Sequence, residues 1–408
     1  MRVALLSPLP PERTGIAGYA AHWMQALREA GVEVICPLQG QKVPDSLASA
    51  RRWVAERQWA GVDVVHAELG GGRDGEFYVM QALAELSPRP ALSATVHDPE
   101  RIVWRPVSAI WRALDRSRIL PPVVSKVAAV LVDPHTLWQE RRLASRLDGV
   151  VTLTRTGGDA LASRMRLQPG AVTVIPHGVV PVPAVPLAPT PPIKLLYFGY
   201  IYSGKGIEDL VDALGQLLRQ QPELAGAVSL TIAGGTAPDI AFGGGRSYLD
   251  ELRERVEQQG LQQAVHWELD VDEAFIAPLI QSHHLMVLPY RESRKLSLLG
   301  QMRGTSGALA WAIACGRAVV TSDARAFAEE ISQGNGLAYP QGDVKRLCEA
   351  LQTVLTEDGR LQACTQAAAD VAQARQWPRV GEAFAAHFKR LAQARTARGG
   401  LNPQRRPA

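Results

Sequence analysis

Residues 193–220 have the sequence IKLLYFGYIYSGKGIEDLVDALGQLLRQ. The apolar run Ile193–Phe198 predicts a buried strand, and the apolar residues of Ile207–Gln220 recur at spacings of three and four, which is typical of a helix. A glycine-rich turn, residues 199–206, joins the two. A strand followed by such a turn and a helix predicts one βα unit of a parallel sheet.

The same rhythm runs through most of the chain. Short apolar runs alternate with longer amphipathic stretches such as Ala17–Ala30 and Tyr248–Gln259, which indicates parallel strands covered by helices on both faces. The further strands are expected at Arg2–Ser7, Val32–Cys36, Val62–His66, Leu92–His97, Val127–Val132, Val150–Leu153, Val172–Ile175, Val228–Ala233, Val265–Trp267, Leu285–Leu288 and Ala318–Thr321.

A proline-rich segment divides the chain into two α/β domains. Prolines at the density of residues 181–192 exclude a helix or an inner strand and predict a semi-rigid linker. We therefore expect domains at 1–180 and 193–373. A helical segment at 374–394 follows, and the basic residues 395–408 are expected to be disordered.

Composition narrows the class of protein. The chain has 408 residues, 46% of them hydrophobic and 21% charged, which is typical of a globular protein with two or three domains. Its 44 basic and 40 acidic residues do not favour nucleic-acid binding. No apolar run has the length of a membrane span, and the first residues are too short for a secretory signal. The four cysteines form no CxxC pair, so neither a zinc site nor a disulfide framework is expected, and the cytoplasm is the expected location.

Two turns of the first domain are candidate sites. Gly15 precedes a predicted helix, whose free amides and dipole favour phosphate, although the glycine is equally explained by the backbone angles of a loop. His97 ends an apolar strand and is placed to hydrogen-bond a hydroxyl or a phosphate, against the commoner structural role of such a histidine. Polar residues also end two other strands, at His66-Ala67-Glu68 and Pro176-His177-Gly178, where turn chemistry is the stronger explanation.

Two turns of the second domain complete the set. Lys205 stands between two glycines at a predicted helix start, where its charge suits a diphosphate. Ser306 is a good N-cap residue and Gly307 opens the next helix, which again suits phosphate.

Together these turns resemble the family 4 glycosyltransferases, which have the two-domain GT-B fold and retain the configuration of the anomeric carbon. The matching motifs follow the family order over Met1 to about Leu391: Thr14-Gly15-Ile16-Ala17-Gly18-Tyr19, Val96-His97-Asp98, Ile175-Pro176-His177-Gly178, Phe198-Gly199, Lys205-Gly206, Ile232-Ala233-Gly234, Leu288-Pro289-Tyr290-Arg291 and Ala312–Val320.

The resemblance implies two facing Rossmann-like domains with a cleft between them. The donor would be a nucleotide-diphosphate sugar bound mostly by the C-terminal domain, with no metal and no further cofactor. Lys205 would neutralise the diphosphate leaving group, and Gly15, Ser306 and Gly307 would donate amides to its phosphates. His97 would lie beside the donor sugar and the acceptor, and residues 374–394 would return to the N-terminal domain.

The sequence departs from the family at the donor site. The two glutamates that the family usually carries correspond to Arg303 and Trp311, and an arginine of the family corresponds to Tyr200. An arginine side chain accepts no hydrogen bond, and tryptophan offers an N–H group and a stacking face. Basic residues of the following loop are the expected replacements for the missing charge: Arg291, Arg294, Lys295 and Arg303.

The prediction is thus a retaining glycosyltransferase that uses a nucleotide sugar, in polysaccharide or glycoconjugate biosynthesis. The alternatives are a GT-B protein that binds a nucleotide sugar, a glycan or a partner without transfer, and a GT-B enzyme of other chemistry such as an epimerase. Trp104 and Trp111 lie among five arginines of residues 101–118, a mixture that suits an anionic membrane surface and a lipid-linked acceptor. Packing of both tryptophans in the N-terminal domain explains the same pattern.

Overall fold

The computed structural model describes residues 1–12, 14–70, 72–104, 107, 122–235, 247–292 and 299–399. The chain forms two compact units. Unit 1 consists of Met1–Gly178, Leu296–Gly304 and Trp377–Ala408, and unit 2 consists of Val179–Lys295 and Thr305–Gln376. Each unit is built on its own parallel sheet, which is described separately below.

The sheet of unit 1 has six parallel strands in the order β2-β1-β3-β4-β5-β6. Pairs such as Val3 with Val64 and Glu68 with Thr95 set its register. The central strands β3 and β4 are buried along their whole length, as continuous apolar runs predict. The strands are β1 (Arg2–Leu6), β2 (Glu33–Ile35), β3 (Val64–Leu69), β4 (Ala91–Val96), β5 (Gly149–Thr152) and β6 (Val172–Val174).

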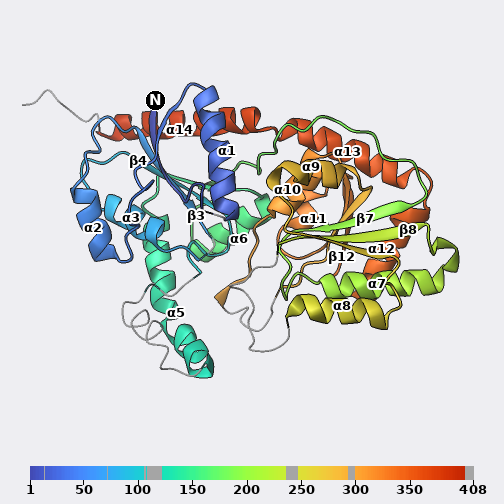
Figure 1. The fold of residues 1–408 in the computed structure, drawn as a ribbon. Coiled ribbons are helices and arrows are strands. Elements are labelled where there is room, and N and C mark those ends of the chain that lie inside the picture. Colours follow the sequence, from blue (N-terminus) through green and yellow to red (C-terminus); the bar gives the residue numbers. More distant parts are fainter. Residues whose placement is uncertain are drawn as a thin grey trace, which may run out of the picture. The chain divides into compact units, whose positions relative to one another are not determined.

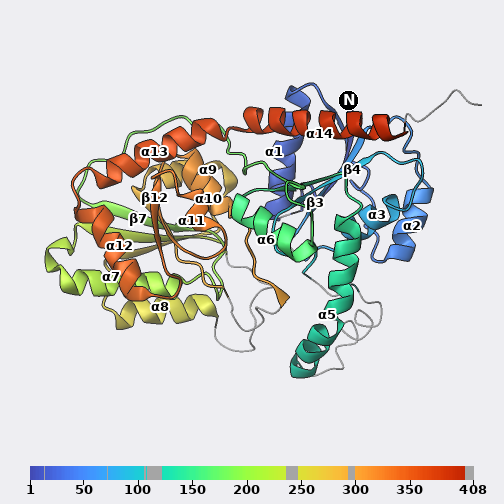
Figure 2. The same ribbon diagram turned by 180° about the vertical axis from the view of Figure 1, so that it is seen from behind.

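Helices cover the sheet of unit 1. Helix α1 packs against α14, which also contacts β3 and β4, whereas α2 packs on α3 and α5 on α6 (Figures 1 and 2). Thr14 is the N-cap residue of α1, because its side chain accepts a hydrogen bond from the Ala17 amide at 3.1 Å. The helices are α1 (Gly15–Glu29), α2 (Leu47–Ala55), α3 (Gly75–Leu83), α5 (Pro122–Ala144), α6 (Arg155–Met165) and α14 (Trp377–Gly399).

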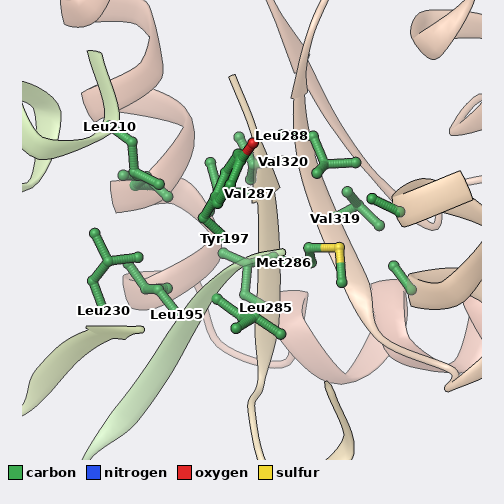
Figure 3. Close-up of a cluster of buried hydrophobic side chains, with 14 of the residues drawn as sticks. Leu195, Tyr197, Leu210, Leu230, Leu285, Met286, Val287, Leu288, Val319 and Val320 are labelled. Carbon is green, nitrogen blue, oxygen red and sulfur yellow. The ribbon is translucent and has the colours of Figure 1, made fainter. Parts of the chain in front are cut away.

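Unit 2 repeats this design. Its six parallel strands have the order β12-β11-β10-β7-β8-β9. Buried residues of its central strands and of the helices that cover them, among them Leu195, Met286 and Val319, form the core shown in Figure 3. The strands are β7 (Ile193–Phe198), β8 (Val228–Gly234), β9 (Val265–Leu269), β10 (Leu285–Leu288), β11 (Ala318–Ser322) and β12 (Gly336–Tyr339).

The helices of unit 2 pack in two groups. Helix α7 packs against α8 and α12, and α10 packs against α9 and α13. The helices are α7 (Ile207–Gln220), the short 3-10 helix η1 (Pro222–Leu224), α8 (Tyr248–Gln258), α9 (Glu273–Gln281), α10 (Gly307–Ala314), α11 (Phe327–Glu330), α12 (Val344–Thr356) and α13 (Arg360–Ala374).

The proline-rich segment contains no helix and no regular strand, and it is attached to unit 2. Gln281 Nε2 donates to the Pro183 carbonyl at 2.7 Å, and Arg317 Nη1 donates to the Val185 carbonyl at 3.1 Å. Arg317 is buried and hydrogen-bonds only carbonyl oxygens among the described residues, including that of His283 at 2.9 Å. Arg317 therefore attaches the proline-rich segment to unit 2 through hydrogen bonds to uncharged carbonyl oxygens.

The structure corrects three expectations. Residues Val127–Val132, expected as a strand, belong to helix α5, because a short apolar run does not distinguish a buried strand from a helix. Strand β12 was not expected, since it is short and only partly buried. Helix α14 continues to Gly399, so residues 395–399 of the expected disordered tail are helical, and residues 400–408 lie outside the described ranges.

A fourth difference concerns the expected continuous domain 193–373. The described residues 299–304 group with unit 1 and not with unit 2. Arg101 Nη1 donates to the Leu299 carbonyl at 3.0 Å, and the Arg303 amide donates to the Pro99 carbonyl. Hydrogen bonds to backbone carbonyls that are distant in sequence cannot be predicted from hydrophobic periodicity. In the described ranges no helix is both long enough and apolar enough to cross a membrane.

Candidate functional site

Both sheets have a point where the strand order reverses. In unit 1 the chain proceeds from β1 outward to β2 and returns to β3, and in unit 2 it proceeds from β7 outward to β8 and β9 and returns to β10. Ligands of open parallel sheets bind outside the carboxyl ends of the strands at such points. The loops after β1 and β3, and after β7 and β10, are therefore the places to look for a site.

In unit 2 the loops after β7 and β10 pack directly on each other. The Arg291 amide donates to the Gly204 carbonyl at 2.9 Å. Gly206 has a φ of 66°, and a Cβ atom at this position would collide with the Pro289 carbonyl. Only glycine combines this backbone angle with this close approach. The packing holds Lys205 at the edge of the sheet.

Lys205 lies against the ring of Tyr290. Its Nζ atom is 3.6 Å from the centroid of the Tyr290 ring and 5.1 Å from that of Tyr202. The lysine is only 9% exposed, and among the described residues it has no ion pair with a carboxylate. A nearly buried ammonium that is stabilised by aromatic faces retains its attraction for an anion.

Tyr290 connects this lysine to the start of α10. Its hydroxyl is 3.2 Å from Ser306 Oγ, and Ser322 Oγ donates to its carbonyl at 2.7 Å. Burial alone would raise the pKa of Tyr290, but the charges of Lys205 and Arg325 and the hydrogen bond to Ser306 lower it. Ser306 occupies the N-cap position of α10, as predicted, without a capping hydrogen bond from its side chain. Gly307 is the exposed first residue of this helix.

Three other residues predicted to contact donor or acceptor lie in unit 2. The guanidinium of Arg291 is bound by the buried carboxylate of Asp209, so it has a structural ion pair. Tyr200 is 50% exposed, and its carbonyl accepts from the Tyr197 hydroxyl at 2.9 Å. Trp311 is partly buried against the core of the unit. The predicted residues Arg294 and Lys295 lie outside the described ranges.

The central feature of unit 1 is a carboxylate between two histidines. Glu68 is fully buried, with Oε2 at 2.7 Å from His97 Nε2 and Oε1 at 3.2 Å from His66 Nε2. Burial alone would raise the pKa of Glu68, but the hydrogen bonds and charges of His66 and His97 lower it to about 2. The carboxylate of Glu68 is therefore ionised at neutral and at mildly acidic pH. His97 is 11% exposed.

Helix α1 covers this group with aromatic rings. The Tyr19 ring meets the edge of His97 at a centroid distance of 4.7 Å, and Trp23 stacks on His66 at 5.2 Å. Burial and the charge of Glu68 raise the pKa of Tyr19 well above its usual value. Gly15 is the exposed first residue of α1, its φ is not positive, and a Cβ there would meet no atom of the structure within 4 Å. The explanation of Gly15 by special loop angles is therefore wrong.

Arg303 is placed in unit 1, next to the end of β4. Its Nε is 4.0 Å from Glu100 Oε1, and its Nη2 donates to Gln301. The adjacent Gly304 lies so close to the His97 carbonyl that a Cβ atom would collide with it. This position is set by tertiary packing and could not be found from the sequence.

Part of the expected membrane-facing surface is buried. Arg101 is 3% exposed and is bound by Glu140 at 2.6 Å and Asp133 at 2.7 Å, so the prediction that it faces a membrane is wrong. Trp104 is partly buried, and its Nε1 donates to the Asp98 carbonyl at 2.8 Å. The other residues of this prediction lie outside the described ranges: Arg105, Trp111, Arg112, Arg116 and Arg118.

The sequence analysis named Glu68 and Tyr290 within motifs but assigned neither of them a role, and it did not name Arg325. A signal for Glu68 was present, since polar residues recur at every second position in both β3 and β4 and must share one face. No comparable signal exists for Arg325, which follows β11. In the described part of the chain, no group of His, Cys, Asp and Glu side chains could hold a metal ion.

Comparison with known proteins agrees with this fold. Residues 192–357 match the family of glycosyl transferases group 1. The chain is 26% identical over 277 residues to the D-inositol 3-phosphate glycosyltransferase of Kineococcus radiotolerans. This alignment covers 65% of the chain and 62% of that protein, so the chain spans less than two thirds of the relative's length.

Solved structures resemble the whole chain. Sucrose-phosphate synthase from Thermosynechococcus elongatus has a TM-score of 0.68 at 18% identity, covering 97% of this chain and 100% of that one. HepE from Anabaena, solved in complex with UDP, has a TM-score of 0.63 at 15% identity, covering 96% and 100%. Such likeness concerns the fold alone. The predicted α/β fold with two parallel-sheet domains, matching the GT-B glycosyltransferases, is confirmed.

Proposed function

We propose that this protein is a retaining glycosyltransferase that moves a sugar from a nucleotide-diphosphate sugar to a glycan or lipid-linked acceptor, in polysaccharide or glycoconjugate biosynthesis. The proposal requires no metal ion and no cofactor other than the donor. The match of residues 192–357 to glycosyl transferases group 1 supports the reaction type, and the relative from Kineococcus radiotolerans is named as a D-inositol 3-phosphate glycosyltransferase. Retention is what the resemblance to family 4 implies.

One observation carries the proposal. Lys205 lies at the carboxyl end of β7, where the strand order of unit 2 reverses, and it is nearly buried without a carboxylate partner among the described residues. A cation held in this state stabilises negative charge more strongly than one in water. Ser306 and the first amides of α10 add hydrogen-bond donors beside the same tyrosine.

The reaction needs these groups because of where charge develops. The bond between the anomeric carbon of the sugar and the diphosphate oxygen breaks, and its electron pair stays on the leaving nucleoside diphosphate. The acceptor hydroxyl forms the new bond to the same carbon, and its proton passes to the departing diphosphate oxygen. Lys205 is assigned to the charge that grows on the leaving group.

We assign the acceptor side of the reaction to His97. Because its Nε2 is hydrogen-bonded to Glu68, the outer nitrogen Nδ1 is left to interact with a ligand hydroxyl. The described residues provide no hydrogen bond to that nitrogen. Glu68 acts through His97 and is a positioning residue, since its carboxylate fixes the orientation of the ring.

The test is a donor screen with UDP-, GDP- and ADP-sugars that measures release of the nucleoside diphosphate, with and without lipid-linked acceptors. We expect one donor to be consumed, and Lys205→Ala to lower the rate at least a hundredfold because a leaving-group charge loses its partner. Lys194→Ala is the matched control, because Lys194 lies at the other end of the same strand. Equal turnover by the Lys205→Ala variant and the wild type would contradict the assignment.

A second function is favoured by one observation. The positions at which the family usually carries glutamates are Arg303, held in unit 1 beside Glu100, and Trp311, partly buried in unit 2. Neither provides a carboxylate for a sugar or a ribose. A GT-B protein that binds a nucleotide sugar without transfer would show a thermal shift with one donor and no product in the same screen.

A further inference from the structure

A second cation of unit 2 lies near the ring that contacts Lys205. The guanidinium carbon of Arg325 is 6.0 Å from the centroid of the Tyr290 ring, and Lys205 Nζ is 3.6 Å from the same centroid. The arginine comes from the loop after β11, and the other two residues come from the loops after β7 and β10. Three neighbouring loops at the carboxyl edge of the sheet thus bring two positive charges to one aromatic ring.

The structure holds Arg325 in an unusual conformation to achieve this. Its φ is 56°, which is uncommon for a residue other than glycine. The backbone amide donates to Glu292 Oε1 at 3.2 Å, and Nη1 donates to the Thr305 carbonyl at 3.1 Å. Thr305 immediately precedes Ser306, the N-cap residue of α10, so the second hydrogen bond holds the guanidinium next to the start of this helix.

Two of the arginines proposed for this charge, Arg291 and Arg303, make contacts away from the Tyr290 ring, and Arg294 lies outside the described ranges. Arg291 is bound by the buried carboxylate of Asp209. Arg303 belongs to unit 1 and lies beside Glu100. Among the described arginines, Arg325 is the one whose guanidinium is found near both Tyr290 and the α10 start.

We propose that Arg325 is the second diphosphate-binding cation of the donor site, acting together with Lys205. The inference rests on the proposed function, since it assumes that the anion is the diphosphate of a nucleotide sugar. A diphosphate carries charge on both phosphoryl groups, which two cations neutralise better than one. A planar guanidinium also donates two parallel hydrogen bonds to phosphate oxygens, which an ammonium cannot do.

The experiment measures binding of UDP, GDP, ADP and inorganic diphosphate by calorimetry. Arg325→Gly is the decisive variant, because glycine accepts the positive φ and removes only the side chain. We expect it to fold as well as the wild type and to weaken binding of the preferred nucleoside diphosphate at least tenfold. Arg325→Lys keeps the charge without the planar fork and should weaken binding less. The control is Arg346→Ala on α12, an exposed arginine paired with Glu349.

The outcomes separate the two proposals. If the wild type binds a nucleoside diphosphate, Lys205→Ala abolishes binding and Arg325→Gly binds like the wild type, the inference about Arg325 is overturned and the proposed function stands. If the wild type binds none of the nucleoside diphosphates, the proposed function fails, and the assignment of Arg325 to its donor fails with it. Equal weakening by Arg325→Gly and Arg346→Ala would show a general effect of net charge and would also overturn the inference.

Discussion

The two units place charged residues at equivalent points of their sheets, but they treat the charge differently. In unit 1 the carboxylate of Glu68 is buried between the imidazole rings of His66 and His97, so its neighbours are supplied by the fold itself. In unit 2 two cations, Lys205 and Arg325, lie beside the neutral ring of Tyr290. The first arrangement is a carboxylate held by two imidazole rings, whereas the second places two cationic side chains near one aromatic ring.

This difference indicates that Glu68 has a structural role in unit 1, whereas the cations of unit 2 are placed to bind a ligand. Internal pairing stabilises and orients His97, and it makes the stability of unit 1 depend on Glu68. Cations supported by an aromatic face contribute less to folding and keep their attraction for an anion. Substitutions in unit 1 should therefore affect stability first, and removal of a cation in unit 2 should affect ligand binding first.

The largest effect is expected from the glycines at the two sites. Gly206→Ala should destabilise unit 2 by about 4 kcal/mol or more, because φ is positive and the new Cβ would collide with the Pro289 carbonyl. Gly15→Ala, at the corresponding turn of unit 1, should change stability by less than about 1 kcal/mol, because space is open and φ is ordinary. Denaturant unfolding of both variants tests the contrast, and equal losses would refute it.

The next effect concerns the buried carboxylate. Burial raises the pKa of Glu68, but the hydrogen bonds and charges of His66 and His97 lower it from 4.5 to about 2, which corresponds to about 3 kcal/mol of stability. Because the folded pKa is the lower one, this contribution is complete above pH 4.5 and is lost as the pH falls toward 2. Glu68→Gln should therefore lose about 3 kcal/mol at neutral pH and flatten the acid side of the stability profile.

Unfolding free energies measured from pH 7 to pH 3 check this. The matched control is Glu85→Gln, a partly exposed carboxylate of the same unit that is paired with Arg51 at 2.8 Å. Because solvent screens such a pair, its loss should cost less than about 1 kcal/mol. A profile for Glu68→Gln that is as steep as that of the wild type would show that the histidines do not hold the carboxylate ionised.

The smallest effect compares two helix starts. Thr14→Ala should cost about 1 kcal/mol, because its side chain caps α1. Ser306→Ala should cost less than about 0.5 kcal/mol, because its side chain makes no capping hydrogen bond in α10 and lies beside Tyr290 instead. Thermal unfolding and nucleotide binding distinguish them, since Ser306→Ala should weaken binding and Thr14→Ala should not. Equal stability losses would mean that Ser306 is a conventional cap.

Most of the fold could be predicted because it depends on local patterns. The strands Ile193–Phe198 and Leu285–Leu288 and the helix Ile207–Gln220 have the predicted bounds. The run Val127–Val132 was assigned to the wrong element because its residues fit a buried helix as well as a strand. Among the candidate residues, Lys205 could be found from its flanking glycines, and its position beside Tyr290 could not.

Hydrophobic periodicity and turn glycines thus determined two α/β domains and the carboxyl ends of the strands as the place of the site, since both follow from short-range preferences. Which charges meet there depended on loops that are far apart in sequence. Arg303 was expected at the donor site but belongs to unit 1, and Arg291 is bound by Asp209. Arg325, from the loop after β11, lies near the Tyr290 ring. Coulomb interactions depend on distance and burial, and folding sets both only after the strands have paired.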